Sequence, residues 1–247
     1  EVRNPDPEVL LGFLNDMEFR TLTRRIADKL GVDAPVIEDA QRVQVKQNAL
    51  SPVPFDAHKY EAVRSMEALK QWIDLINERG YVAVDTETTA LDEMCAELVG
   101  ISICVEAGEA CYIPLTHKVV GDDDLFGSIA LAEDQLPLKD VLRALKPVLE
   151  NPAILKIGQN MKYDAKIFAR YGIAVAPIDD TMLISYALHG GLHSHGMDTL
   201  SKRYLSHETI PIKPLLGSGK SAITFDKVSI SDATPYAAED ADVTLRL

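Results

Sequence analysis

Apolar positions in the chain recur at two spacings, which distinguish expected strands from expected helices. Residues 81–87 form a continuous, β-branched apolar run that ends in polar residues, and this pattern is typical of a buried strand. Similar runs at 98–106 and 110–115 predict a second and a third strand, joined by a turn at 107–109. This part of the chain is therefore expected to form neighbouring strands of one sheet.

The second half of the chain alternates between strand and helix spacing. Residues 153–158 predict a fourth strand, and 231–247 predict a last helix with Pro235 in its first turn. Strands followed by strand–helix alternation indicate an α/β fold, with a mixed β-sheet flanked by helices. The expected helices cover residues 65–80, 138–150, 159–172, 179–188, 196–205 and 231–247, and the expected polar loops cover 120–130 and 206–228.

The beginning of the chain has a different pattern. Residues 1–32 look helical, with basic side chains near the C-terminal end and a stop at Gly31. Residues 33–56 have weak periodicity and end in two prolines, which prevent a continuing helix. We therefore expect a short helical segment and a linker at 1–56, followed by a compact domain at 57–247.

Composition narrows the class of protein. The 247 residues are 47% hydrophobic and 26% charged, as in ordinary globular proteins. No apolar run approaches the roughly 18 residues that cross a bilayer, and the N-terminus lacks a secretory pattern. Scattered cysteines without a CxxC pair (Cys95, Cys104 and Cys111) favour reduced thiols. We expect a cytoplasmic protein without membrane contact, and the missing initial Met suggests a fragment or a processed product.

The net charge of −13 argues against sequence-independent binding of nucleic acid through a basic surface. It reflects either simple solubility or carboxylates gathered around cations. Asp85 and Glu87 are two positions apart on an expected strand, so both side chains point to the same face. Such a pair repels unless a cation lies between its members, and a hard divalent ion is suitable. A solvated strand end explains this pair equally well.

Two helical motifs add further candidates. Asn160 and Asp164 are four residues apart, and so are Tyr236 and Asp240, which places each pair on one face of an expected helix. Taken singly, each motif is also an ordinary surface pattern. Asp242 falls on a different face of the last helix, and we expect it to be solvated.

The order of the three motifs resembles that of a known superfamily. DxE at the end of a strand, NxxxD on a middle helix and YxxxD on the last helix are similar to the exonuclease motifs of the tyrosine-bearing branch of the DnaQ-like superfamily. From about residue 60 to the end, the chain looks like the proofreading domain of bacterial family A DNA polymerases, and the N-terminal piece resembles the end of the preceding flap-nuclease region. The similar phrases are VAVDTETTALD, LVGISI, YIPL, ILKIGQNMKYD, DTMLISYAL and YAAEDADVTL.

This resemblance implies a ribonuclease H-like fold and a 3′→5′ exonuclease with two divalent cations, Mg²⁺ or Mn²⁺. It implies that Asp85 bridges the two ions, and that Glu87 and Asp240 complete the site whose ion activates water. Asp164 would help to hold the second ion, and Tyr236 would orient the attacking water. Two ions about 4 Å apart suit the hydrolysis of a phosphodiester.

The resemblance also implies contacts with DNA. Thr88, Leu91, Asn160 and Tyr163 match positions that line the terminal nucleotide, although an apolar residue after a strand, such as Leu91, is more often part of a core. The expected substrate is DNA with a single-stranded or frayed 3′ end, which releases nucleoside monophosphates. A polymerase domain is expected in cis in the full-length protein. Candidate phosphate contacts are Lys156, Lys162, Lys166, Lys202, Arg203, Lys213 and Lys220.

Two other motifs carry less weight. GSGKS at 217–221 has Pro214 where a phosphate-binding loop requires Gly, and it is expected to be a flexible basic turn. HGGLHSH at 189–195 lacks the HExxH pattern, which favours satisfied or exposed histidines. Three alternatives to the DNA exonuclease are an RNA-trimming exonuclease of the same superfamily, a non-catalytic module that binds DNA 3′ ends, and a structural remnant with a chance acidic cluster.

Overall fold

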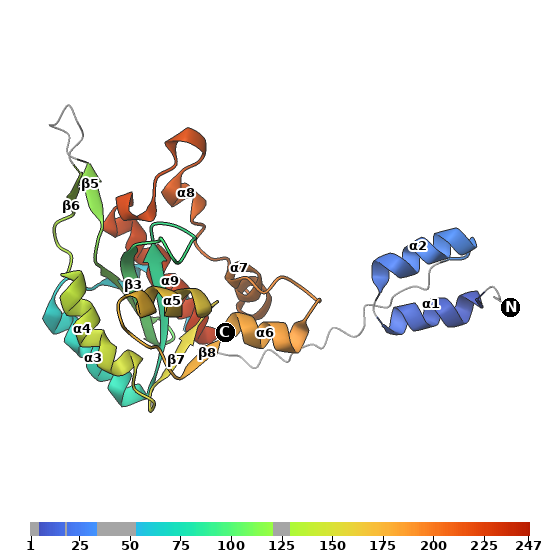
Figure 1. Ribbon diagram of the computed structural model, residues 1–247, viewed down its shortest axis with the longest axis horizontal. Coiled ribbons are helices and arrows are strands. Elements are labelled where there is room, and N and C mark those ends of the chain that lie inside the picture. Colours follow the sequence, from blue (N-terminus) through green and yellow to red (C-terminus); the bar gives the residue numbers. More distant parts are fainter. Residues whose placement is uncertain (1–4, 18, 34–52, 121–128) are drawn as a thin grey trace. The chain divides into compact units, whose positions relative to one another are not determined.

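A computed structural model shows the helices and strands of the chain (Figure 1). The chain divides into two compact units, Glu1–Asn48 and Ala49–Leu247. Among the described residues, no helix has the length and apolar character required to span a membrane. The structure describes residues 5–17, 19–33, 53–120 and 129–247.

The described residues of the first unit form two helices, α1 (Pro7–Asp16) and α2 (Arg20–Leu30). Asp6 caps α1, because its carboxylate accepts hydrogen bonds from the first backbone N–H groups of the helix. Gly31 ends α2 in the left-handed region, at φ +66°. The helical prediction for this part of the chain is therefore confirmed, as two helices.

A six-stranded mixed sheet forms the centre of the second unit, with the strand order β1-β4-β3-β2-β7-β8. The pairs β2–β3 and β3–β4 are antiparallel, whereas β1–β4, β2–β7 and β7–β8 are parallel. All four predicted strands are present. The strands of this sheet are β1 Glu61–Ala62, β2 Tyr81–Thr88, β3 Leu98–Glu106, β4 Glu109–Pro114, β7 Leu155–Gly158 and β8 Ile178–Asp180.

Four short strands are absent from the prediction. These are β1 and β8 of the main sheet, and the antiparallel pair β5 (Lys118–Val120) and β6 (Ile129–Leu131). The loop predicted at 120–130 is thus wrong at both ends, and its residues 121–128 lie outside the described part of the chain. Strands of two or three residues are too short to show an alternating pattern, which explains why they were missed.

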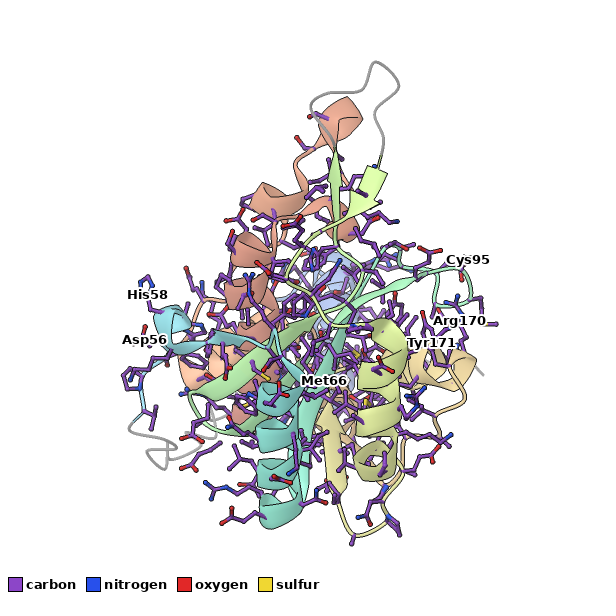
Figure 2. The ribbon with its side chains drawn as sticks, turned by 90° about the vertical axis from the view of Figure 1, so that its left-hand side faces the viewer. Asp56, His58, Met66, Cys95, Arg170 and Tyr171 are labelled. Carbon is purple, nitrogen blue, oxygen red and sulfur yellow. The ribbon has the colours of Figure 1, made fainter. Side chains whose placement is uncertain are left out.

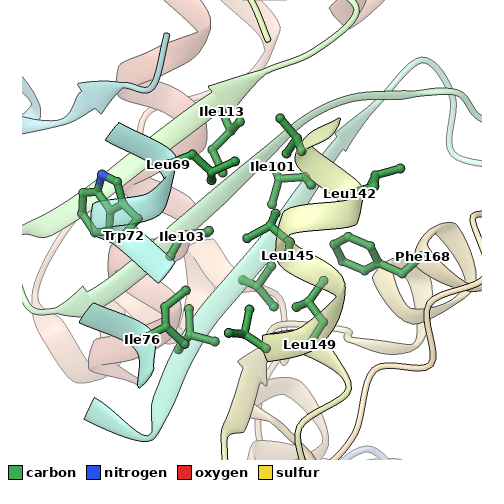
Figure 3. Packing of buried hydrophobic residues seen from close by; sticks show 14 of the residues in the cluster. Leu69, Trp72, Ile76, Ile101, Ile103, Ile113, Leu142, Leu145, Leu149 and Phe168 are labelled. Atoms are coloured by element: carbon green, nitrogen blue, oxygen red, sulfur yellow. The ribbon is translucent and has the colours of Figure 1, made fainter. Parts of the chain in front are cut away.

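Two helices, α3 (Met66–Arg79) and α4 (Leu138–Leu149), cover one face of the sheet. Both were predicted; α3 is capped by Ser65, whose Oγ accepts a hydrogen bond from the Ala68 N–H at 3.1 Å. The side chains between these helices and the strands form the main core. Figure 3 labels Leu69, Trp72, Ile76, Ile101, Ile103, Ile113, Leu142, Leu145, Leu149 and Phe168 of this cluster.

Helix α9 (Ile230–Arg246) covers the opposite face. Small side chains there, including Ala83 of β2 and Ala238 and Ala241 of α9, pack in one buried cluster and let the helix lie close to the strands. Ser229 caps α9, so the helix begins one residue earlier than predicted. Pro235 is its sixth residue and lies beyond the first turn, which corrects the predicted position.

The remaining helical segments differ from the prediction in extent. The helix predicted at 159–172 begins only at Lys162, and the loop predicted at 206–228 contains three short helical turns. The segments are η1 Ala57–Lys59, α5 Lys162–Arg170, α6 Thr181–His189, α7 Met197–Leu200, η2 Ser201–Leu205, α8 Lys213–Leu216, η3 Gly219–Ser221 and η4 Phe225–Lys227. Of these, α5, α8 and η4 contribute residues to the functional site described below.

Candidate active site

Three acidic side chains meet where β2 ends beside α9. Asp85 and Glu87 alternate with Thr86 on β2, so they point to the face of the sheet that α9 covers. Asp240 of α9 faces them, and one carboxylate oxygen from each residue lies within 4.8 Å of the other two. Within the described parts of the chain, no other group of three or more His, Cys, Asp or Glu side chains is close enough to hold a metal ion. This group of three carboxylates is called the acidic triad below.

Asp164 is fixed beside the acidic triad by β2. It is buried in the first turn of α5, where it accepts hydrogen bonds from the backbone N–H of Thr86 at 3.0 Å and from the Thr86 hydroxyl. Thr86 lies between Asp85 and Glu87, and its side chain therefore points to the other side of the strand. Strand β2 thus carries the carboxylates of Asp85 and Glu87 and also holds that of Asp164 through Thr86.

These four carboxylates line a pocket of about 430 Å³. All nine residues that were predicted from the sequence as site residues line it. Nine further lining residues were not predicted, and most of them follow β2 or lie in the segment before α9, where no periodic pattern indicates them. They are Thr86, Thr89, Ala90, Gln159, Ile212, Leu216, Ile223, Thr224 and Phe225.

Burial and mutual repulsion act on the four acids together. Burial, followed by the charges of the other three acids, raises the pKa of Asp85 well above its usual range, and burial does the same for Glu87. Burial raises the pKa of Asp164 to about 7, although the hydrogen bonds from Thr86 favour its charged form. Burial raises the pKa of Asp240 to about 8. A cluster of this kind favours the uptake of either protons or cations.

Tyr236 lies one helical turn before Asp240 and donates a hydrogen bond to that carboxylate. Burial raises the pKa of the phenol well above its usual range, so the hydroxyl keeps its proton at neutral pH. The ring centroid of Tyr236 lies 5.9 Å from that of Phe225, which forms part of the pocket wall.

The residues after β2 form a second wall of the pocket. The hydroxyl groups of Thr88 and Tyr163 lie 2.5 Å apart, and that of Tyr163 also donates to the carbonyl of Ala90. The Leu91 side chain is 95% exposed, which excludes the alternative that it belongs to the core. An apolar side chain is therefore presented to solvent at the rim of an acidic pocket.

Asn160 lines the pocket from a turn before α5, and not from the helix that its spacing from Asp164 predicts. Its backbone is left-handed, at φ +62°, and it lies two residues before α5, so it shares no helical face with Asp164. The prediction of a shared face is therefore wrong. The buried carboxylate of Asp180 accepts hydrogen bonds from the N–H groups of Asn160 at 3.1 Å and Met161 at 2.8 Å, and so supports this turn.

Lys156 is a correction to the predicted phosphate contacts. Its side chain is fully buried, and Nζ donates hydrogen bonds to the carbonyls of Asn151 at 2.9 Å, Ile154 at 2.7 Å and Ala176. It therefore cannot reach a phosphate at the surface. Among the other candidates, Lys166 pairs with Glu93 and Lys202 pairs with Glu208. Lys162, Arg203 and Lys213 are exposed, and the side chain of Lys220 lies outside the described part of the structure.

Asp242 is not solvated as predicted, but fully buried. It accepts hydrogen bonds from the Tyr60 hydroxyl at 2.8 Å, the Gly108 N–H at 3.0 Å and the Arg246 Nε–H at 2.7 Å. The prediction failed because two distant segments, which carry Tyr60 and Gly108, cover this face of α9, and no local spacing reveals their approach to the helix. Asp242 is therefore a structural carboxylate that is separate from the acidic triad.

The two weaker motifs do not join the pocket's acids. Gly219–Ser221 of the GSGKS segment form a single 3-10 turn. In the HGGLHSH segment, His195 forms a hydrogen bond with Ser185 at 2.9 Å, and His193 lies 3.3 Å from the Tyr204 hydroxyl. These histidines have hydrogen-bond partners within the protein.

Comparison with known proteins agrees with this geometry. A family model described as a 3′–5′ exonuclease matches residues 60–247. DNA polymerase I of Rhizobium leguminosarum is 41% identical over 301 aligned residues, which cover 96% of this chain and 29% of the relative. DNA polymerase I of Pseudomonas aeruginosa is 37% identical over 246 residues, which cover 98% of this chain and 25% of the relative. The chain thus spans less than a third of the length of these relatives.

The arrangement of helices and strands is also found in solved structures. An RNase D of Trypanosoma brucei, solved in complex with RNA U12, aligns with a TM-score of 0.57 and 15% identity, over 76% of this chain and 60% of that chain. At this identity the likeness concerns the fold alone. Together with the mixed six-stranded sheet, it confirms the predicted ribonuclease H-like α/β fold.

Proposed function

The chain belongs to the 3′–5′ exonuclease domain family of bacterial DNA polymerase I, and on that premise we propose that it removes nucleotides one at a time from the 3′ end of DNA by hydrolysis with two divalent cations. The observation that supports this most strongly is the acidic triad, with Asp164 beside it in one pocket. The released products would be nucleoside monophosphates.

The family implies dependence on a divalent metal, and the donor set fits such an ion. All four acidic side chains offer oxygen ligands, which suit Mg²⁺ and Mn²⁺. Their burial raises their pKa values and so disfavours the charged forms, which a bound cation would stabilise. We assign Asp85, Glu87 and Asp240 to one ion, and Asp85 with Asp164 to a second. When bound, the ions would lower the pKa of the attacking water and neutralise charge on the leaving 3′ oxygen.

The other pocket residues would position the reacting groups. Tyr236 keeps its proton and would orient the attacking water next to Asp240. Asn160, Thr88 and Tyr163 would contact the terminal nucleotide, and Leu91 would press against its base from the rim of the pocket. An unpaired or frayed 3′ end would enter the pocket most readily, because a paired terminal base must first be separated from its partner.

We further propose that this chain proofreads for a polymerase domain in the same polypeptide. The two relatives compared above are DNA polymerases, of which the chain covers only 29% and 25%. In this proposal residues 57–247 are the exonuclease domain, and residues 1–56 are the end of a preceding nuclease domain with its linker.

The test is a time course on 5′-labelled single-stranded DNA, with Mg²⁺ or with EDTA. A ladder of shortening products that needs the metal supports the proposal, whereas a shift of intact DNA would indicate a binding module. Asp240→Asn should slow cleavage by several orders of magnitude. Asp232→Asn, on an exposed position of the same helix, is the matched control and should cleave normally. RNA of the same sequence would reveal a preference for ribose.

Counting the bound ions tests the two-cation part separately. Calorimetric titration of Mn²⁺ into the wild-type chain should give two sites, and Asp164→Asn should lose one of them. A single site in the wild-type chain would contradict the two-ion assignment while leaving the metal dependence intact.

A further inference from the structure

A buried histidine lies behind the wall of the pocket. His117, which follows β4, is only 1% exposed, and it does not line the pocket. Nothing in the proposed hydrolysis uses it. Its contacts nevertheless lead directly to the segment that forms the pocket wall.

The hydrogen bonds of His117 define the position of its proton. Nδ1 lies 2.8 Å from the carbonyl oxygen of Val228, and Nε2 lies 2.7 Å from the Tyr112 hydroxyl. A carbonyl can only accept, so Nδ1 must carry the hydrogen, and Nε2 of the neutral ring then accepts from Tyr112. Burial lowers the pKa of His117, in agreement with a neutral ring. Both ring nitrogens are thus satisfied in one tautomer.

The absence of a side chain at Gly100 makes room for the Tyr112 ring, which hydrogen-bonds to His117. Tyr112 crosses β3 at Gly100, where a Cβ atom would lie 2.1 Å from the tyrosine oxygen. Any larger residue at position 100 would therefore displace the phenol from His117. The tyrosine is fully buried, so solvent cannot replace His117 as the partner of its hydroxyl in this structure.

The neighbours of His117 reinforce its position. The side-chain amide of Gln135 accepts from the His117 N–H at 2.8 Å and donates to the His117 carbonyl at 3.0 Å. The next residue, Lys118, pairs with the buried carboxylate of Asp226 at 2.8 Å. Residues 117 and 118 therefore hold the segment before α9 at two points, Asp226 and Val228.

This segment carries the aromatic wall of the pocket. The Val228 N–H donates to the Phe225 carbonyl at 3.0 Å, which closes the turn η4. The Phe225 ring lies 6.0 Å from that of His117 and 5.9 Å from that of Tyr236, and it lines the pocket. A shift of Val228 would therefore move Phe225 relative to the site.

We propose that His117 is a positioning residue of the exonuclease, which holds the Phe225–Val228 turn and thereby sets the wall against which the 3′-terminal nucleotide lies. This inference rests on the proposed function. In this proposal His117 contacts neither the substrate nor the cations. The four carboxylates come from β2, α5 and α9 rather than from this turn. Loss of the histidine should therefore weaken the binding of the nucleotide and leave the binding of the cations unchanged.

The test is steady-state cleavage of single-stranded DNA by His117→Ala and His117→Asn. His117→Ala leaves the Val228 carbonyl and the Tyr112 hydroxyl without partners, and KM should rise about tenfold while kcat changes by less than about threefold. The amide nitrogen of Asn can occupy the place of Nδ1, so His117→Asn should recover most of the lost affinity. The Mg²⁺ concentration for half-maximal rate should stay unchanged in both variants.

Tyr60→Phe is the matched structural control. It also deletes one buried phenol hydrogen bond, to Asp242 at 2.8 Å, but at a place that does not line the pocket. It should lower the melting temperature without raising KM. Should His117→Ala fail to fold, Lys118→Met loosens the same turn from its other contact and should raise KM in the same direction, by about threefold.

The outcomes separate this inference from the proposed function. If the wild-type chain is active and His117→Ala has the same KM, the inference is overturned and the proposed function is not. The same holds for Lys118→Met if that variant replaces His117→Ala. A rise in KM that Tyr60→Phe reproduces overturns it as well, since the effect would then be general destabilisation. A wild-type chain without Mg²⁺-dependent cleavage overturns the proposed function, and with it this inference.

Discussion

Tyr60 donates its phenolic hydrogen to Asp242 over 2.8 Å, and this buried contact joins the residue before β1 to the last helix. Asp242 also binds Arg246, whose guanidinium carbon lies 3.9 Å from the centre of the Phe55 ring. Figure 2 labels Asp56 and His58 of the same segment, which precedes β1. The segment from Phe55 to Tyr60 is thus held against α9 by a buried, charge-assisted network.

The first prediction concerns this network. Asp242→Ala leaves the Arg246 guanidinium and the Tyr60 hydroxyl without their partner, and should lower the free energy of unfolding by about 3–5 kcal/mol. Denaturant titration measures the loss. Asp232→Ala, at an exposed position of the same helix, should change it by about 1 kcal/mol or less. A loss for Asp242→Ala as small as that for Asp232→Ala would mean that Asp242 is solvated, as its spacing alone indicates.

The second prediction concerns pH in the absence of metal. The pKa of Asp164 is raised to about 7 and that of Asp240 to about 8 in the folded chain, whereas an unfolded Asp titrates near about 3.9. Between these values the folded chain binds more protons than the unfolded one, so its stability should fall as the pH rises from about 4 to about 8. In EDTA we expect the melting temperature to decrease by more than about 10 °C over this range.

Two controls accompany this pH series. Mg²⁺ should raise the melting temperature most at the alkaline end, where the carboxylates are charged, and Asp240→Asn should flatten the profile in EDTA. Thermal unfolding by circular dichroism measures both. Stability that increases with pH in EDTA, through the same interval, would show that the pKa values of Asp164 and Asp240 are not raised in the folded chain.

The third prediction concerns Lys156. Lys156→Met removes the donor that three backbone carbonyls share, and should destabilise the chain by about 1–3 kcal/mol. The dependence of DNA binding on salt should remain as in the wild-type chain, because the ammonium group makes no phosphate contact. Lys162→Met, at an exposed position of α5, is the comparison and should leave stability unchanged. If DNA binding by Lys156→Met depends less on salt than binding by the wild-type chain, then Lys156 contacts a phosphate, as the sequence predicts.

The fold was predictable wherever an element was long enough to show a pattern. Strand β2 has eight residues and β3 has nine, and helix α3 carries both its capping serine and its terminal glycine. In contrast, β1 and β8 have two and three residues, and their pairing depends on neighbours elsewhere in the chain. Their backbone hydrogen bonds exist only in the assembled sheet.

The site was partly predictable for a similar reason. The alternation on β2 indicates that Asp85 and Glu87 share a face, and the spacing on α9 places Tyr236 beside Asp240. The left-handed backbone of Asn160 and the burial of Asp242 depend on tertiary contacts, and so does the place of Phe225 in the pocket wall. No residue spacing within the chain indicates these contacts in advance.

The loop that carries Leu91 provides the basis for the last prediction. Arg170 of α5 donates hydrogen bonds to the carbonyls of Glu93, at 3.0 Å, and Ala96, and Lys166 pairs with the Glu93 carboxylate. Figure 2 labels Arg170 and Cys95 on these neighbouring segments. The two cations of α5 thus fix a loop whose apolar residue remains exposed.

We expect Leu91→Ala to slow cleavage of blunt duplex ends about tenfold more than cleavage of single-stranded ends, because only a paired end needs help to separate its last base. Arg170→Met should act in the same direction and less strongly, since it loosens the loop without removing the side chain. Initial rates on matched 5′-labelled substrates measure this ratio. Met94→Ala, an exposed apolar residue of the same loop that does not line the pocket, should leave the ratio unchanged. An equal loss on both substrates would show that Leu91 contacts the nucleotide without helping to separate the strands.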